Sequence, residues 1–168
     1  MNHILYHGGV PGLKPGDLIQ PGHTRQTVDD CPICRMREEQ GVDAPFDATH
    51  HPDSVYCTPV RLYARYHASL YGHGDVYQVT PIGDLTRSSE DTIESYRCVS
   101  LRVVRVVEAR VELTWKDRRR LDRLWANADR AHGHMVSTLD ALPRNATPRM
   151  INDWQRRQLL IAERLLSQ

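Results

Sequence analysis

The stretch from Ser95 to Leu113 constrains the fold most, because β-branched and aliphatic residues dominate it. Such residues favour extended backbone, and we interpret the stretch as two strands with a bend near Glu108-Ala109. Shorter strands are predicted earlier in the chain, at residues 4–6, 18–19, 54–58 and 75–79. The first of these runs into a loop at His7-Gly8-Gly9. The front of the chain is therefore predicted to be rich in β-structure.

Helical patterns are expected in two places. Thr58-Pro59 resembles the start of a helix that reaches about Tyr71, with an apolar face made of Leu62, Tyr63, Tyr66 and Leu70. From Thr114 onward the hydrophobic spacing becomes helical, with a stop predicted at Gly133, a short piece at 135–142 and a last helix from Thr147-Pro148. The sequence thus predicts an α+β protein with a domain at 1–113 and a helical extension at 114–168 packed on it.

The net charge of +1 conceals an asymmetry along the chain. Residues 1–114 have a net charge of −4 and residues 115–168 a net charge of +5, and 20 of the 22 basic residues are arginine. A basic tail is typical either of a solvated helix face or of a surface that contacts nucleic acid or an acidic partner. No segment has the roughly 20 apolar residues of a membrane span, and the start lacks a signal pattern. A cytoplasmic protein without a membrane partner is expected.

Residues 23–54 have no periodicity, and a loop of this length in a compact domain needs a cause for its order. Cys31 and Cys34 form a CxxC pair, and two histidines would complete a tetrahedral Cys2His2 site. We predict a structural zinc ion bound by His23, Cys31, Cys34 and His51, with His50 as substitute for a histidine ligand. A reduced loop without metal and a redox-active pair are the alternatives, whereas Cys57 and Cys98 are interpreted as buried side chains.

The polar residues of the front part suit the cleavage of a nicotinamide–ribose bond. That reaction passes through an oxocarbenium-like state, which needs positioning and a carboxylate more than a nucleophile. A histidine at a strand end can hydrogen-bond a ribose hydroxyl, and the glycines after it let the backbone approach a carboxamide. Aromatic rings on a strand and on the next helix can stack on nicotinamide. Alone, the histidine is as typical of a plain turn, Tyr56 and Tyr66 are more typical of a core, and Glu94 is more typical of a solvated strand start.

Five segments in order resemble the rifampin ADP-ribosyltransferases over roughly residues 4–108. These are Tyr6-His7-Gly8-Gly9 with Leu13 to Leu18, Val55-Tyr56, Ala64-Arg65-Tyr66, Asp75 to Gly83, and Ser95-Tyr96-Arg97 with Leu101 to Val104. The resemblance implies the diphtheria-toxin-like class of ADP-ribosyltransferases, which combine a histidine, a tyrosine and an acid and use NAD. It also implies split antiparallel sheets with a helix after the second motif strand.

The resemblance further implies roles for single residues. His7 would bind a ribose of NAD, Gly8 would contact the carboxamide, and Tyr56 and Tyr66 would stack on nicotinamide. Glu94 is preferred as the acid, so that His7, Tyr56 and Glu94 form the catalytic set. Glu90 and Asp91 are its competitors, because the alignment across 84–93 is ambiguous.

The leading hypothesis is a mono-ADP-ribosyltransferase that transfers ADP-ribose from NAD to an unidentified acceptor, either a macromolecule or a rifamycin-like small molecule. An RNA 2′-phosphotransferase of the same superfamily is a second enzyme hypothesis, with His67 and Arg97 as available residues. The third hypothesis is a zinc-ordered binding module without catalysis, whose basic tail engages a nucleic acid or a protein.

Overall fold

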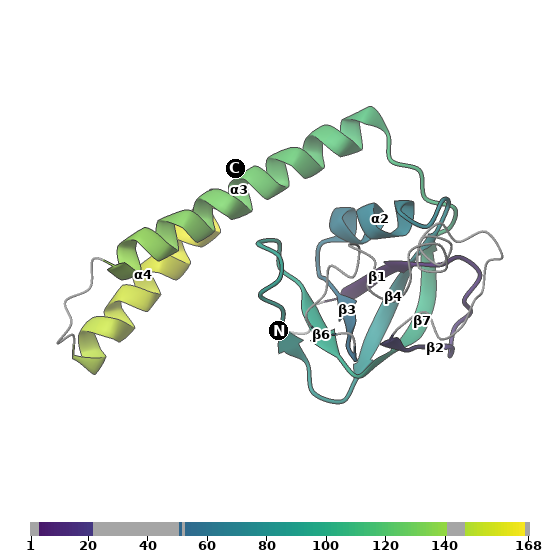
Figure 1. Cartoon of the computed structure of the whole chain (residues 1–168), viewed down its shortest axis with the longest axis horizontal. Coiled ribbons are helices and arrows are strands. Elements are labelled where there is room, and N and C mark those ends of the chain that lie inside the picture. The colour runs from purple at the N-terminus through teal and green to yellow at the C-terminus, as the bar shows by residue number, and fades with distance from the viewer. Residues whose placement is uncertain (1–3, 22–50, 52, 141–146, 167–168) are drawn as a thin grey trace, which may run out of the picture. The chain divides into compact units, whose positions relative to one another are not determined.

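The computed structural model describes residues 4–21, 51, 53–140 and 147–166 (Figure 1). Within helices α3 and α4, the side chains of residues 134–140, 158 and 162–166 are outside this description. The chain divides into two compact units, Met1–Asp117 and Arg118–Gln168. The first contains all described strands and helix α2, and the second contains most of α3 together with α4. The predicted packing of the helical extension on the first domain stays a prediction.

A four-stranded antiparallel sheet has the order β1-β4-β7-β2. Its strands are β1 (Leu5–Gly9), β4 (Asp75–Ile82), β7 (Ser100–Glu108) and β2 (Leu18–Ile19). The predicted first strand is therefore longer than expected, because β4 pairs with it as far as Gly9. A second antiparallel sheet has the order β3-β6-β5, formed by β3 (Val55–Cys57), β6 (Tyr96–Cys98) and β5 (Thr86–Arg87).

The two sheets enclose the main core of the first unit. Tyr77 and Leu101 are completely buried there, and Val55, Cys57 and Cys98 approach them from the second sheet. Side chains alternate between the two faces of a strand, so Tyr77 faces this core whereas Val76 faces the opposite side. The sheets are joined at one bridge, where Tyr6 of β1 pairs with Thr58 directly after β3. The predicted α+β class with antiparallel sheets is confirmed.

Helix α2 (Arg61–Ser69) covers the other face of the four-stranded sheet, as Figure 1 shows. Its buried residues are Tyr63, Ala64 and Ala68, and the two alanines pack with Val76 and Val111. Of the predicted apolar face, Tyr63 is buried, but the prediction was wrong for Leu70, which is 42% exposed. Small residues occupy the contact because α2 approaches β1 closely.

The predicted start of this helix was also wrong. Thr58 does not cap α2, which begins three residues later with Val60 as its N-cap residue and no side-chain cap. The Thr58 hydroxyl instead donates to the backbone oxygen of Glu94 at 2.6 Å and accepts from the N–H of Val60 at 3.0 Å. Thr58 thus ties the loop before β6 to the turn that leads from β3 into α2.

The two strands predicted within residues 95–113 are present, but their boundary is elsewhere. They separate at Val99, which is 67% exposed, and β7 then runs without interruption to Glu108. The predicted bend near Glu108-Ala109 is the end of β7. Pairing with β4 from Ser100 to Glu108 keeps β7 extended over this length.

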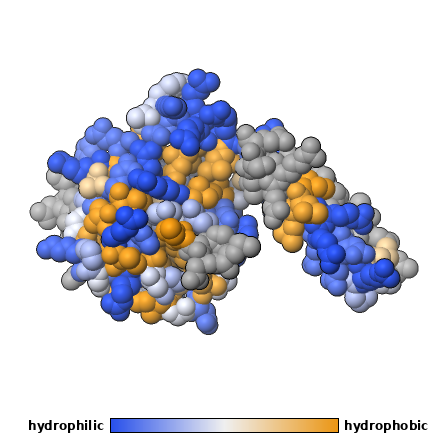
Figure 2. All heavy atoms as spheres, turned by 180° about the vertical axis from the view of Figure 1, so that it is seen from behind, coloured by the Kyte–Doolittle hydropathy of each residue, from blue (hydrophilic) through white to orange (hydrophobic). Residues whose placement is uncertain are grey.

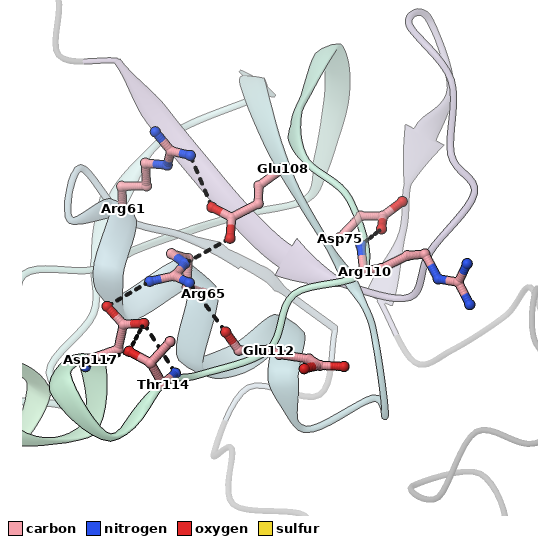
Figure 3. Close-up of polar contacts among 8 residues, drawn as sticks. All are labelled: Arg61, Arg65, Asp75, Glu108, Arg110, Glu112, Thr114 and Asp117. Carbon is pink, nitrogen blue, oxygen red and sulfur yellow. Dashed lines mark hydrogen bonds and ion pairs between the residues drawn. The ribbon is translucent and has the colours of Figure 1, made fainter.

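An ion-pair cluster links α2, β7 and the first turn of α3 (Figure 3). Arg65 contacts Glu108 at 3.0 Å and Asp117 at 2.9 Å, and its guanidinium also donates to the backbone oxygen of Glu112 at 3.3 Å. Arg61 contacts the second carboxylate oxygen of Glu108 at 2.9 Å. All of these residues belong to the first unit, so the cluster fixes the segment between β7 and α3 against α2.

Helices α3 (Trp115–Asp140) and α4 (Pro148–Leu166) make up the rest of the chain. The predicted stop at Gly133 and the separate piece at 135–142 were wrong, because α3 continues through Gly133. One glycine in a helix interior costs only about 1 kcal/mol relative to alanine, which a 26-residue helix tolerates. On the face seen in Figure 2, hydrophobic patches lie among hydrophilic residues on both units. Among the described helices, none is both long and apolar enough to span a membrane.

Candidate functional site

His7 and Tyr56 meet where β1 and β3 lie side by side. The His7 Nδ1 atom is 2.8 Å from the backbone oxygen of Tyr56. A carbonyl oxygen only accepts hydrogen bonds, so Nδ1 of neutral His7 carries the hydrogen and Nε2 is an acceptor. The contact fixes both the orientation and the tautomer of the imidazole.

Gly8 and Gly9 each need to lack a side chain, but for different reasons. A Cβ atom on Gly8 would lie 1.8 Å from the backbone oxygen of Ala64 and 2.7 Å from the backbone nitrogen of Ala68. Gly8 is thus required by the close approach of α2. A Cβ atom on Gly9 would lie 2.7 Å from Nε2 of His7, so Gly9 leaves room for the imidazole ring.

The backbone of Gly8 points to the edge of β1 that faces away from β4. Tyr6 exchanges hydrogen bonds of 2.8 and 2.9 Å with Thr58 on this edge. The direction of backbone N–H and C=O groups alternates along an antiparallel strand, so Gly8 presents both groups on the same edge. Among the described residues, neither group has a hydrogen-bond partner there. Gly8 is buried, so this donor and this acceptor lie below the surface next to His7.

Three carboxylates of the segment before β6 each accept a hydrogen bond from a different tyrosine hydroxyl. Tyr56 donates to Glu90 Oε1 at 2.8 Å, Tyr63 donates to Asp91, and Tyr96 donates to Glu94. Tyr56 therefore contacts His7 through its backbone oxygen and Glu90 through its hydroxyl. It places the Glu94 side chain on Tyr96, a neighbour in the same strand region.

Aromatic side chains gather on α2. The rings of Tyr63 and Tyr66 are nearly parallel with centroids 6.2 Å apart, and His67 meets both rings edge-on at 4.6 and 5.2 Å. Burial lowers the pKa of His67 to about 4; the nearby His7 acts in the same direction and Asp91 opposes the shift. His67 is therefore neutral at neutral pH. Burial and the hydrogen bond to Asp91 raise the pKa of Tyr63 above its ordinary value.

The sequence favoured Glu94 over Glu90 and Asp91 as the acid and gave Tyr63 no role in the site. Their sequence signals are visible in retrospect. Tyr63, Tyr66 and His67 have the three- and four-residue spacing of one helix face, and Glu90 with Asp91 forms the acidic pair closest to this helix. Spacing alone does not say which tyrosine meets which acid, because that depends on the path of the loop before β6.

Three of the four predicted zinc ligands, His23, Cys31 and Cys34, lie outside the described residues, as does the substitute His50. His51 is described and half-buried, and its backbone oxygen accepts from Ser54 at 3.0 Å. Within the described part of the chain no group of three or more His, Cys, Asp or Glu residues could hold a metal ion. The zinc site stays a prediction.

Fold and site together define an α+β protein with two antiparallel sheets, in which a tyrosine of β3 contacts a histidine of β1 through its backbone and a loop carboxylate through its hydroxyl. No protein-family model matches the chain. Comparisons with curated proteins and with solved structures found no significant match either.

Proposed function

We propose that the protein is a mono-ADP-ribosyltransferase that cleaves the nicotinamide–ribose bond of NAD and transfers ADP-ribose to an acceptor. The observation that carries this proposal is the double role of Tyr56. Its backbone oxygen accepts from His7 at 2.8 Å, and its hydroxyl donates to Glu90 at 2.8 Å. One strand residue thus connects the histidine and the carboxylate that this chemistry requires.

The residues present suit NAD as a substrate. Nε2 of His7 is an acceptor in the tautomer that the Tyr56 carbonyl selects, which is the role needed for a ribose hydroxyl. The N–H and C=O of Gly8, which no other described residue binds, match the oxygen and the amino group of a carboxamide. Tyr56 and Tyr66 provide rings for nicotinamide. The structure supports these assignments by the placement of His7 and Gly8 on one strand.

Glu90 replaces Glu94 as the proposed acid. The transition state of glycosidic cleavage develops positive charge on the ribose, and a fixed carboxylate stabilises it. Glu90 accepts from the hydroxyl of Tyr56, the residue whose backbone oxygen binds His7, whereas Glu94 accepts from Tyr96. The tyrosine hydroxyl orients the Glu90 carboxylate before the substrate arrives.

Release of nicotinamide from NAD tests the proposal without knowledge of the acceptor. The wild-type protein is expected to hydrolyse NAD slowly in the absence of an acceptor. Glu90→Gln should lower the rate about 100-fold or more, which is the usual effect of losing one electrostatic stabiliser. Glu94→Gln is the matched control, because it makes the same change on a carboxylate that also binds one tyrosine, and its rate should stay within about threefold of wild type.

Two results would contradict this assignment. If Glu94→Gln loses the activity and Glu90→Gln keeps it, the acid is assigned wrongly. If wild-type protein releases no nicotinamide and transfers no label from NAD to any protein or nucleic acid of a cell extract, the enzyme hypothesis fails.

A further inference from the structure

Helix α3 exposes a row of arginines in the second unit. Arg120, Arg123, Asn127 and Arg130 line a hollow of about 430 Å³ together with Leu124. Their spacing of three, four and three residues places them on one side of the helix, over about 15 Å of its length. We call these residues the arginine face. It is distinct from the site at β1 and β3, and the argument for it is independent of NAD.

The charge of the arginine face is not neutralised. Arg120, Arg123 and Arg130 are exposed, and in the described part of the chain none of them forms an ion pair. Arg123 donates to the backbone oxygen of Arg119 at 3.3 Å, and Arg130 donates to the side chain of Asn127. Arg65 of the first unit differs from these arginines, because its charge is neutralised by two carboxylates.

We propose that the arginine face binds the phosphate backbone of a nucleic acid without sequence specificity. Along the helix axis, Arg120 and Arg123 are separated by about 4.5 Å, and Arg123 and Arg130 by about 10.5 Å. The guanidinium group matches phosphate oxygens with paired donors. The three arginines therefore span the length of several phosphates of one strand, which is more than a single anion occupies.

The lining of the hollow favours a nucleic acid over a protein partner. Protein interfaces depend on buried aromatic or large aliphatic anchors, and among the described lining residues only Leu124 is apolar. None of the described lining residues offers an aromatic ring on which a base could stack, so backbone contacts dominate. Binding that consists of such contacts depends steeply on salt and weakly on sequence.

The test uses the full-length protein and fluorescence anisotropy with two labelled probes of mixed sequence, a single-stranded RNA of about 20 nucleotides and a DNA duplex of the same length. Replacing Arg120, Arg123 and Arg130 with glutamine should weaken binding at least about tenfold. The slope of log K against log salt should fall by about 2–3, since each lost phosphate contact contributes about 0.7–0.9.

The control variant has Arg149, Arg156 and Arg157 replaced with glutamine. These arginines are exposed on α4 in the same unit, so the variant loses the same charge outside the arginine face. It should bind within about threefold of wild type. A further variant with lysine at 120, 123 and 130 keeps the charge and should keep most of the salt slope. Circular dichroism reports whether each variant retains its helices. If the glutamine variant loses helix, the proposal is judged from the probe binding of the lysine variant and of the control variant.

Three outcomes would overturn the proposal. Wild-type protein that binds neither probe would do so, as would equal losses in the two glutamine variants, which would show a general effect of charge. Displacement of the probes by poly-glutamate at equal charge concentration would assign the face to an acidic protein. Because none of these assays contains NAD, their failure is separate from failure of the proposed transferase activity.

Discussion

Gly8 and Gly9 are adjacent in β1 but depend on different neighbours. Gly8 faces backbone atoms of α2, which shift only if the helix moves away from the sheet. Gly9 faces the imidazole of His7, which rotates about its own side-chain bonds. The first glycine therefore bears on stability and the second on the position of a functional side chain.

Alanine at these two positions is expected to separate the two effects. Gly8→Ala should lower the free energy of unfolding by about 3 kcal/mol, because a Cβ atom 1.8 Å from a carbonyl oxygen displaces α2. Gly9→Ala should change it by less than about 1 kcal/mol but lower the rate of NAD cleavage about tenfold or more by moving His7. Denaturant unfolding measures the stability of both variants, and nicotinamide release measures their rates of NAD cleavage. Equal stability of the two variants would contradict the close approach of α2 to Gly8.

His67 predicts how stability depends on pH. Burial lowers the pKa of His67 from 6.5 to about 4 in the folded protein, so between these values the unfolded chain binds a proton that the folded protein excludes. The stability present above pH 6.5 should therefore decline as the pH falls towards 4, by roughly 3 kcal/mol from this residue. Denaturant unfolding at several pH values measures this loss.

A glutamine in place of His67 removes the titrating group. The variant His67→Gln should show a smaller loss of stability between pH 6.5 and 4 than the wild type. His132→Gln is the control, since His132 is exposed on α3. The same pH profile for wild type and His67→Gln would show that His67 is not buried as described.

At the scale of elements, α2 is the part that organises the first unit. It covers the four-stranded sheet, carries the aromatic residues of the candidate site, and holds the start of α3 through Arg65. Thr114 begins α3 with reciprocal hydrogen bonds, since its hydroxyl accepts from the N–H of Asp117 at 3.2 Å and its own N–H donates to the Asp117 carboxylate at 3.1 Å. The same carboxylate pairs with Arg65, so Asp117 belongs both to the N-terminal cap of α3 and to the ion-pair cluster.

Arg65 and Arg61 both bind Glu108, which makes them a matched pair for mutation. Arg65→Met should lower the free energy of unfolding by about 1–3 kcal/mol, because it leaves the half-buried carboxylates of Glu108 and Asp117 without their shared partner. Arg61→Met should cost less than about 1 kcal/mol, since the Arg61 side chain is 50% exposed. Thermal unfolding of both variants tests this order, and equal small losses of stability would show that the cluster has no structural role.

At the scale of the whole molecule, the cysteines separate into two groups. Cys57 is buried between the sheets, and burial raises its pKa to about 12, so it stays a thiol and is a poor metal ligand. Cys31 and Cys34 are the pair with the spacing of a zinc knuckle. Among the cysteines, the predicted zinc site therefore depends on Cys31 and Cys34 alone.

Elemental analysis of the purified chain should give about one zinc per molecule if His23, Cys31, Cys34 and His51 bind it. Replacing Cys31 and Cys34 with serine should remove the metal and lower the melting temperature, because zinc binding contributes to folding. Cys57→Ala should keep the zinc. A content below about a tenth of an equivalent in the wild type would refute the site.

How much of this could be predicted from sequence differs between fold and site. Local patterns predicted most elements: alternating residues predicted β4, and Thr147-Pro148 predicted the start of α4. The errors lie where a neighbour decides. The buried face of α2 is set by its contact with Gly8, and the extent of β7 is set by pairing with β4.

The sequence by itself predicted a front part rich in strands and a helical tail, and it singled out His7 and Tyr56 on two of the strands. Only the tertiary structure decided which carboxylate contacts Tyr56. Glu90, Asp91 and Glu94 all carry carboxylates and are close in sequence. Each accepts a hydrogen bond from a different tyrosine because the loop before β6 turns between them. Contacts across 34 residues, such as that of Tyr56 with Glu90, depend on chain path rather than on local propensity.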